Sequence, residues 1–169
     1  YTNVCQYSCR FCAFSKGGGE AATGRAAYDI DAEEPHRRVA EAADLGATEV
    51  CLQGGIHPDY TGQTYLDIVE TVRKAAPEMH IHAFSPLEVD QGAQTLNMPV
   101  DDYIGLLKTA GLDSLPGTAA EVLDADVRRV LCPDKVSAER WLEIMAAAHE
   151  QGLSSTATIM FGHVDTPAA

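Results

Sequence analysis

The stretch Cys5-Gln6-Tyr7-Ser8-Cys9-Arg10-Phe11-Cys12 says more about the fold and function of this chain than any other part of it. Its cysteines have the spacing C-x3-C-x2-C. Three thiolates this close together on a short loop can hold three irons of a 4Fe-4S cluster, which normally takes four cysteines, and leave the fourth iron open to a small molecule. We therefore expect Cys5, Cys9 and Cys12 to be the protein ligands of one 4Fe-4S cluster.

Two other uses of the cysteines fit the sequence less well. A structural zinc site needs four closed ligands and usually shows two paired spacings, whereas the remaining cysteines, Cys51 and Cys132, are single and distant from the motif. A disulfide framework is disfavoured because five cysteines leave one unpaired and because the chain lacks the cysteine density of small secreted scaffolds. Cys51 and Cys132 are therefore expected to be structural.

The composition bounds the class of protein. The 169 residues are enough for one domain with a sizeable core. No apolar run approaches the roughly 20 residues that span a bilayer, and free cysteines with an oxygen-sensitive cluster suit a reducing compartment. We therefore expect a soluble, cytoplasmic protein with no membrane partner. A net charge of -13 without clustered Lys or Arg argues against a nucleic-acid partner.

Strand and helix patterns alternate about five times along the chain, which implies parallel strands joined by right-handed crossovers. Strands are expected at 2–4, 48–53, 79–84, 112–115 and 154–161, with a flexible, Gly- and Ala-rich connection at 15–29. Helices are expected at 31–45, 65–76, 99–110 and 136–151. The glycine motif of doubly wound folds is absent at the first turn, where the cysteines stand instead. We therefore favour an α/β fold with a barrel of the TIM type, here a partial barrel of about five βα units.

In such a barrel the reacting groups lie on the loops that follow the C-terminal ends of the strands. Besides the cysteines, the candidates at these positions are Gln53, Gly54, Gly55, His57, Ser85, Glu88, Glu121, His163 and Asp165. The glycine pair either lets backbone carbonyls approach a ligand closely or makes an ordinary turn. A lone histidine can be an acid, a base or a ligand, but it is more often structural, and His80 and His82 are also explained as filling of the barrel interior.

Six stretches together identify a family that the chain resembles. They are Thr2-Asn3-Val4-Cys5, Cys12-Ala13-Phe14-Ser15-Lys16, Glu49-Val50-Cys51-Leu52-Gln53-Gly54-Gly55-Ile56-His57-Pro58, His82-Ala83-Phe84-Ser85-Pro86-Leu87-Glu88-Val89, Leu115-Pro116-Gly117-Thr118-Ala119-Ala120-Glu121 and Ile159-Met160-Phe161-Gly162-His163. With the cysteine spacing, they resemble the radical S-adenosylmethionine (SAM) enzymes, and among these the tyrosine-using half of FO synthase. The similarity implies that residues 1–169 are one radical SAM core domain. Because the chain opens at Tyr1 and stops just after an apolar run, we expect it to be a fragment truncated at both ends.

The resemblance implies cofactors, partners and a reaction. In the family, the amino and carboxyl groups of SAM bind the open iron of the 4Fe-4S cluster, and an electron donor reduces the cluster so that SAM is cleaved to a 5'-deoxyadenosyl radical. The radical takes a hydrogen from L-tyrosine, the Cα–Cβ bond breaks, and the hydroxybenzyl unit is joined to 5-amino-6-(D-ribitylamino)uracil. The second FO synthase half, separate or fused, then closes the deazaflavin ring of FO, the precursor of coenzyme F420.

The resemblance also implies roles for single residues. The three motif cysteines match the cluster ligands, and Phe11 matches the aromatic residue near the SAM adenine. Gly54 and Gly55 match the backbone site for the SAM amino end. Glu121 resembles a carboxylate that holds SAM, and Arg140 resembles an arginine that pairs with the SAM carboxylate, a task that suits a planar guanidinium.

These roles have plainer alternatives. Glu121 could be an ordinary acid at a helix start, and Arg140 could lie on a solvated helix face. The remaining candidates are assigned to the substrate pocket only: His57, Ser85, Glu88 and His163.

Two other functions fit parts of the pattern. The menaquinone (futalosine) branch of radical SAM enzymes shares the cysteine loop and a similar glycine-His-Pro turn, but residues 84–88 and 115–118 favour FO synthase. A non-catalytic iron-sulfur electron carrier would need Cys51 or Cys132 to reach the cluster as a fourth ligand. Because about five strands fall short of a closed barrel, we also expect that residues 1–169 alone do not make a competent enzyme.

Overall fold

A computed structural model describes residues 1–13 and 27–166 of the chain. Most of the connection predicted at 15–29 lies outside these residues. The helices in the described residues are α1 (Glu33–Asp44), α2 (Gly62–Ala75), α3 (Pro86–Thr95), α4 (Val100–Ala110), α5 (Ala125–Leu131) and α6 (Ala138–Glu150). The strands are β1 (Glu49–Leu52), β2 (His80–Ala83), β3 (Ser114–Leu115) and β4 (Ser154–Ser155). No helix in this part of the chain is both long enough and apolar enough to cross a membrane.

The strands form a parallel sheet with the order β1-β2-β3-β4, so each strand lies beside its neighbour in the sequence. Ser114 of β3, for example, pairs with both His82 of β2 and Ser154 of β4. A doubly wound sheet would reverse its strand order part-way. An order without reversal, with helices in the connections, is the winding of a barrel. The predicted parallel α/β class is therefore confirmed.

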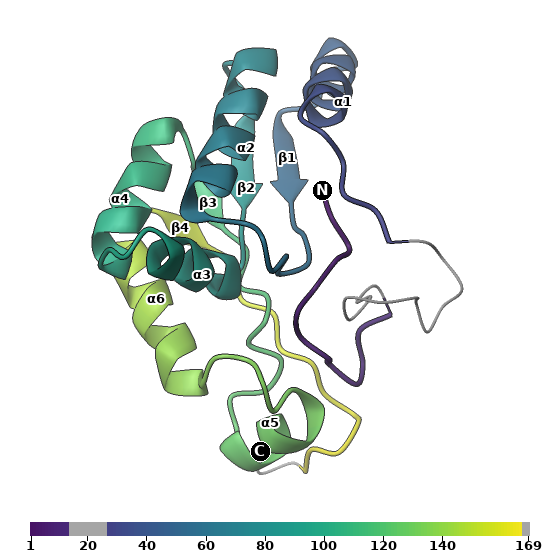
Figure 1. The fold of residues 1–169 in the computed structure, drawn as a ribbon, viewed down its shortest axis with the longest axis vertical. Coiled ribbons are helices and arrows are strands. Elements are labelled where there is room, and N and C mark those ends of the chain that lie inside the picture. The colour runs from purple at the N-terminus through teal and green to yellow at the C-terminus, as the bar shows by residue number, and fades with distance from the viewer. Residues whose placement is uncertain (14–26, 167–169) are drawn as a thin grey trace.

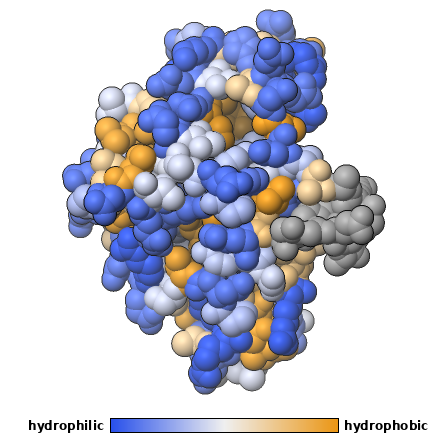
Figure 2. All heavy atoms as spheres, in the orientation of Figure 1, coloured by the Kyte–Doolittle hydropathy of each residue, from blue (hydrophilic) through white to orange (hydrophobic). Residues whose placement is uncertain are grey.

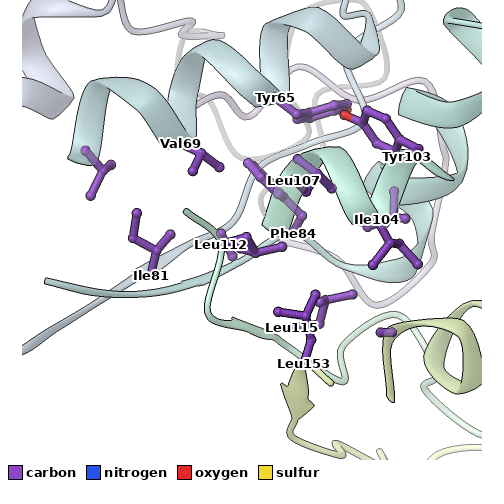
Figure 3. Packing of buried hydrophobic residues seen from close by; sticks show 14 of the residues in the cluster. Tyr65, Val69, Ile81, Phe84, Tyr103, Ile104, Leu107, Leu112, Leu115 and Leu153 are labelled. Carbon is purple, nitrogen blue, oxygen red and sulfur yellow. The ribbon is translucent and has the colours of Figure 1, made fainter. Parts of the chain in front are cut away.

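The main core fills the space between the sheet and the helices that cover it. Ile81 and Ala83 of β2 are buried there, whereas His80 and His82 point to the other face and are only partly covered. Figure 3 shows core side chains from α2, β2 and α4 pointing toward one another, Leu107 among them. In Figure 1, α2, α4 and α6 lie to the left of β1, and the N-terminal segment runs to its right. The N-terminal segment thus lies on the side of β1 away from these helices, and its Tyr1 packs against the edge of the core.

All four predicted helices are present, as α1, α2, α4 and α6, with ends close to those expected. Ala32 stands at the N-cap of α1, and Asp31 just before it accepts hydrogen bonds through Oδ1 from the N–H groups of Glu33 and Glu34. The sequence does not predict α3 and α5. The apolar pattern of α3 is not one-sided, since this helix is buried on several sides, and α5 has only seven residues.

The prediction of a strand at 2–4 is wrong. Thr2 makes only an isolated antiparallel bridge with Asp29. The carbonyl of Thr2 accepts a hydrogen bond from the N–H of Gly55 at 2.9 Å, and its hydroxyl donates to the carbonyl of Tyr28 at 2.9 Å. Because the Thr2 carbonyl bonds to Gly55 and the Thr2 hydroxyl bonds to Tyr28, residues 2–4 do not form the regular hydrogen-bond ladder of a strand. The described residues therefore contain four strands rather than five.

The predicted strand at 154–161 is shorter than expected. β4 ends at Ser155, and an isolated parallel bridge between Glu121 and Ile159 continues its direction. The N–H of Met160 donates to the carbonyl of Glu121 at 2.7 Å. The segment after β4 therefore stays beside the segment after β3, without regular pairing.

The surface visible in Figure 2 is mainly hydrophilic, as the net charge of -13 leads one to expect. Apolar atoms are exposed along its lower right, where the segment after β4 runs in Figure 1. The exposed apolar residues of that segment are Ile159, Phe161 and Val164.

Candidate functional site

A cavity of about 430 Å³ lies at the carboxyl ends of the strands, beside the cysteine loop (residues 5–12). Its wall comes from the start of the chain, the cysteine loop, the residues that follow β1, β2 and β3, and the segment after α5. The predicted site residues that line it are Cys5, Cys9, Phe11, Cys12, Gln53, Gly54, Gly55, Ser85, Glu88 and Glu121. The parallel strands thus bring most of the candidates to one place.

Backbone hydrogen bonds hold the cysteine loop in this wall. The N–H of Gln6 donates to the carbonyl of Ile56 at 2.9 Å, and the N–H of Cys12 donates to the carbonyl of Cys9 at 3.2 Å. The N–H of Ile56 donates to Cys5 Sγ at 3.4 Å. Burial raises the pKa of Cys9 to about 11, so this thiol must lose a proton when it becomes a metal ligand.

Gly54 and Gly55 allow the start of the chain to lie against the loop after β1. A Cβ atom at Gly55 would overlap the carbonyl of Val4, and one at Gly54 would overlap the ring of Tyr1. The close approach that this glycine pair permits is therefore made by the protein's own N-terminal residues. Both glycines also line the cavity.

Ser85 and Glu88 begin α3 with a capping box. Glu88 is buried and accepts hydrogen bonds from the Ser85 N–H at 2.6 Å, from the Ser85 hydroxyl at 2.7 Å and from the Tyr1 hydroxyl. Burial raises the pKa of Glu88, although these hydrogen bonds oppose the rise. Phe84, just before the box, has a φ of 66°, which costs energy in a non-glycine residue. These contacts give Ser85 and Glu88 a structural role in the cavity wall.

Glu121 and Lys135 form an ion pair in the same wall. Lys135 Nζ lies 2.7 Å from Glu121 Oε1, and both side chains are largely buried. Lys135 Nζ also lies over the Phe11 ring, 5.4 Å from its centre, within the range of a cation–π interaction. Glu121 has a φ of 56°, so the loop after β3 holds it in a strained conformation. Lys135 thus connects the cysteine loop to the loop after β3.

Nearly the whole chain, the cysteine loop included, matches one known family. The family model described as the radical SAM superfamily matches residues 1–168. The chain belongs to the radical SAM superfamily. The prediction made from the cysteine spacing is therefore confirmed at this level.

Relatives within the radical SAM superfamily support the finer resemblance. The chain is 47% identical over 167 residues to the 5-amino-6-(D-ribitylamino)uracil--L-tyrosine 4-hydroxyphenyl transferase of Methanopyrus kandleri, covering 99% of this chain and 44% of that protein. It is also 47% identical over 167 residues to the FO synthase of Streptomyces avermitilis, covering 99% of this chain and 19% of that protein. The similarity to the tyrosine-using half of FO synthase is thus confirmed, over less than half the length of these relatives.

A solved structure shows the same fold. The crystal structure of HydG, a maturase of the FeFe-hydrogenase, matches 95% of this chain and 34% of its own with a TM-score of 0.69 and 15% sequence identity. At this identity the likeness concerns the fold alone. It supports the barrel-type winding of the radical SAM chain over nearly all of its length.

The chemistry of the cavity residues fits the cofactors that the radical SAM family implies. The three motif cysteines are free and line the same cavity. Thiolates are soft ligands that suit iron-sulfur clusters rather than hard cations. Within residues 1–13 and 27–166, no three His, Cys, Asp or Glu side chains are grouped as a single metal ion would require. The fit therefore rests on the kind of donors and on their shared cavity.

Four predicted candidates do not line the cavity: His57, Arg140, His163 and Asp165. His57 stacks on a neighbouring tyrosine ring, with 4.7 Å between the ring centres. Arg140 on α6 pairs with Asp90 on α3 at 2.7 Å. His163 Nδ1 lies 3.0 Å from Asp165 Oδ1. Each of these side chains therefore has a protein partner, and the roles suggested for them stay predictions.

Lys135 is the charged cavity residue that the sequence does not predict. It lies after α5, outside the strand ends and outside the stretches that resemble the family. Arg128 of α5 is also unexpected: it is buried and donates to the carbonyls of Val122 at 3.2 Å and Val136 at 2.5 Å. A sequence signal for this segment is Pro133, because proline often marks the end of a helix.

Proposed function

We propose that this chain is part of a radical SAM transferase that joins the 4-hydroxybenzyl group of L-tyrosine to 5-amino-6-(D-ribitylamino)uracil in the synthesis of FO. One observation carries the proposal: the motif cysteines, Phe11 and Glu121 line one cavity in a chain that is 47% identical, over 99% of its length, to a transferase of that name. An electron donor and the other FO synthase half, separate or fused, would be its partners.

Cys5, Cys9 and Cys12 would hold a 4Fe-4S cluster through their thiolates. When bound, the cluster and SAM together supply a 5'-deoxyadenosyl radical that can take a hydrogen atom from tyrosine. The protein's own task is to bind, orient and shield these groups. Because Cys9 is partly buried and its pKa is raised to about 11, its proton would leave when the cluster is assembled.

SAM would lie in the cavity between the cysteine loop and the residues that follow β1 and β3. There Phe11 can face the adenine, the backbone of Gly54 and Gly55 can accept the amino end, and the Glu121 carboxylate can accept hydrogen bonds. The apolar lining residues Ile56, Leu87 and Ala119 pack as one cluster. Such a lining excludes water, which protects a reactive intermediate from side reactions.

The other candidates differ in how easily they reach this space. Ser85 and Glu88 line the cavity and stay our candidates for its substrate side. Arg140 would have to leave Asp90 to meet the SAM carboxylate. His57 and His163 could act only on a ligand that extends beyond the cavity.

An iron-sulfur electron carrier is the second candidate, because one contact favours it. Cys132 packs in the same apolar cluster as Cys9, so it is the cysteine nearest to becoming a fourth ligand. A closed cluster would leave no iron open to SAM. Against this, Cys132 is buried and is not among the residues that line the cavity.

The test is an anaerobic incubation of the reconstituted protein with SAM, a reductant, isotope-labelled L-tyrosine and the uracil. We expect 5'-deoxyadenosine and a uracil adduct that contains the labelled ring, both absent from Cys9→Ser. Because the relatives are longer than this chain, the assay is repeated on the M. kandleri relative with its matching residues replaced by this chain. SAM cleavage without the adduct in both proteins would overturn the transferase, and a cluster that never cleaves SAM would favour the carrier.

A further inference from the structure

Lys135 is the one cationic side chain among the described residues that line the cavity. Glu88 and Glu121 supply the carboxylates of the same lining. Hydrogen bonds that cap α3 engage Glu88, whereas Glu121 pairs with Lys135. The charge near the space proposed for SAM therefore depends on the pair of Lys135 and Glu121.

The pair is well shielded from water. Only 10% of the Lys135 side chain and 15% of the Glu121 side chain are exposed. Burial acts to lower the pKa of Lys135, but the charge and the hydrogen bond of Glu121, with further contributions from Cys9 and Cys132, raise the pKa overall. A buried ion pair adds little net stability, because desolvation offsets the attraction. Because the pair of Lys135 and Glu121 adds little to stability, its role is better explained as holding the cavity wall in one arrangement.

The segment that carries Lys135 also supports the cysteine loop. The N–H of Arg10 donates to the carbonyl of Leu131 at 3.1 Å, and the N–H of Ser8 donates to Asp134 Oδ2 at 3.1 Å. Lys135 follows at once and covers the Phe11 ring. Residues 131–135 therefore hold the cysteine loop through the Leu131 carbonyl and the Asp134 carboxylate, and they reach the cavity through Lys135.

We propose that Lys135 is a positioning residue for SAM: its ammonium fixes the Glu121 carboxylate in one arrangement, and the affinity for SAM depends on that arrangement. The inference rests on the SAM site of the proposed function, but not on the identity of the substrates. It explains why a lysine that no local pattern predicts is buried beside the cysteine loop. It also explains why Glu121 is held in a strained conformation.

The test measures SAM binding by titration in reconstituted protein, without tyrosine or the uracil, so that a wrong substrate assignment leaves it intact. Lys135→Met should weaken SAM binding roughly ten-fold or more, as is typical when a group that orients a ligand-binding residue is removed. Iron content per chain should not change, and addition of SAM should alter the electron paramagnetic resonance spectrum of the reduced cluster less than in the parent. Lys135→Arg should restore SAM affinity to within about three-fold of the parent, since it keeps the charge.

The signature of a residue that acts through another is non-additivity. If Lys135 acts through Glu121, the double variant Lys135→Met/Glu121→Gln should bind SAM no more weakly than Glu121→Gln alone. Lys74→Met is the matched control, because Lys74 pairs with Glu70 at 3.1 Å on the exposed face of α2, and it should bind SAM like the parent.

A SAM affinity of Lys135→Met within about two-fold of the parent would overturn the proposal. So would losses that simply add in the double variant, because Lys135 would then act independently of Glu121. Should Lys135→Met not fold, Glu121→Gln and the double variant carry the test, since the double variant replaces the whole pair by neutral groups. Equal SAM affinity in Glu121→Gln and the double variant supports the proposal. A further loss of SAM affinity of about ten-fold in the double variant would overturn it.

Discussion

The helix-packed core and the cavity at the carboxyl ends of the strands are built in different ways. The core consists of regular elements whose apolar side chains, such as Leu107, are completely buried. At the cavity end, Phe84, Ala119 and Glu121 are three of the four described non-glycine residues with positive φ. A buried carboxyl group and a buried ion pair lie there as well. The helix-packed core therefore supplies stability to this domain, whereas the cavity end holds its strained and charged groups.

The largest expected effect belongs to the core. Leu107→Ala should lower the free energy of unfolding by about 2–5 kcal/mol, because it leaves a cavity among packed side chains. Its neighbour Leu106 is 41% exposed, so Leu106→Ala is the matched control and should change stability by no more than about 0.5 kcal/mol. Urea denaturation measures both. An equal loss in the free energy of unfolding of both variants would show that the buried and exposed faces of α4 contribute alike to stability.

A smaller effect is expected from Glu88, and it depends on pH. Burial raises the pKa of Glu88 above its usual 4.5, so just above that pH the folded state binds the proton more tightly than the unfolded state. By linkage, the contribution of Glu88 to stability falls as the pH rises from 4.5 to the folded pKa, and is then constant. Denaturation of the parent and of Glu88→Gln across this range should show a difference in stability that shrinks as the pH rises. A constant difference would mean that Glu88 does not titrate as its burial implies.

The smallest effect is expected at Arg140, which pairs with Asp90 outside the cavity. Arg140→Lys keeps the charge at a partly exposed pair, so the loss of stability should be at most about 1 kcal/mol. We expect SAM affinity to fall less in this variant than in Lys135→Met, because Lys135 lines the cavity and Arg140 does not. Titration with SAM compares the two. A greater loss in Arg140→Lys would show that the resemblance assigns the cation correctly and that Arg140 leaves Asp90 when SAM binds.

The features that could be predicted from the sequence are local ones. The cysteine motif depends only on the spacing of residues within one short loop. The limits of α1 are also local signals: Asp31 accepts a hydrogen bond at the start of the helix, and Gly46, which has a positive φ, follows its end. Ser85 and Glu88 also carried a local signal, the S-x-x-E pattern of a capping box followed at once by Pro86. Both residues are predicted as substrate-pocket candidates because they follow a strand, whereas the pattern itself predicts the start of α3.

The rest depends on contacts between distant parts of the chain. Lys135 meets Glu121 because α5 and its buried Arg128 turn the chain back toward the loop after β3, and no local spacing encodes that meeting. Likewise, residues 2–4 have strand-like composition, but their backbone bonds to Gly55 and Tyr28 instead of to a strand. Such choices are made by tertiary packing, which overrides local preference.

The central claim is that the cavity thiols hold the cofactor of this radical SAM chain, and iron and sulfide content after anaerobic reconstitution tests it most directly. Cys5→Ser, Cys9→Ser and Cys12→Ser are each compared with Cys51→Ser and Cys132→Ser, which are matched controls outside the cavity lining. We predict that each of the first three variants loses the 4Fe-4S cluster and that both controls keep it at the level of the parent. A full-strength cluster in any of the first three variants, or its loss from either control, would contradict the assignment.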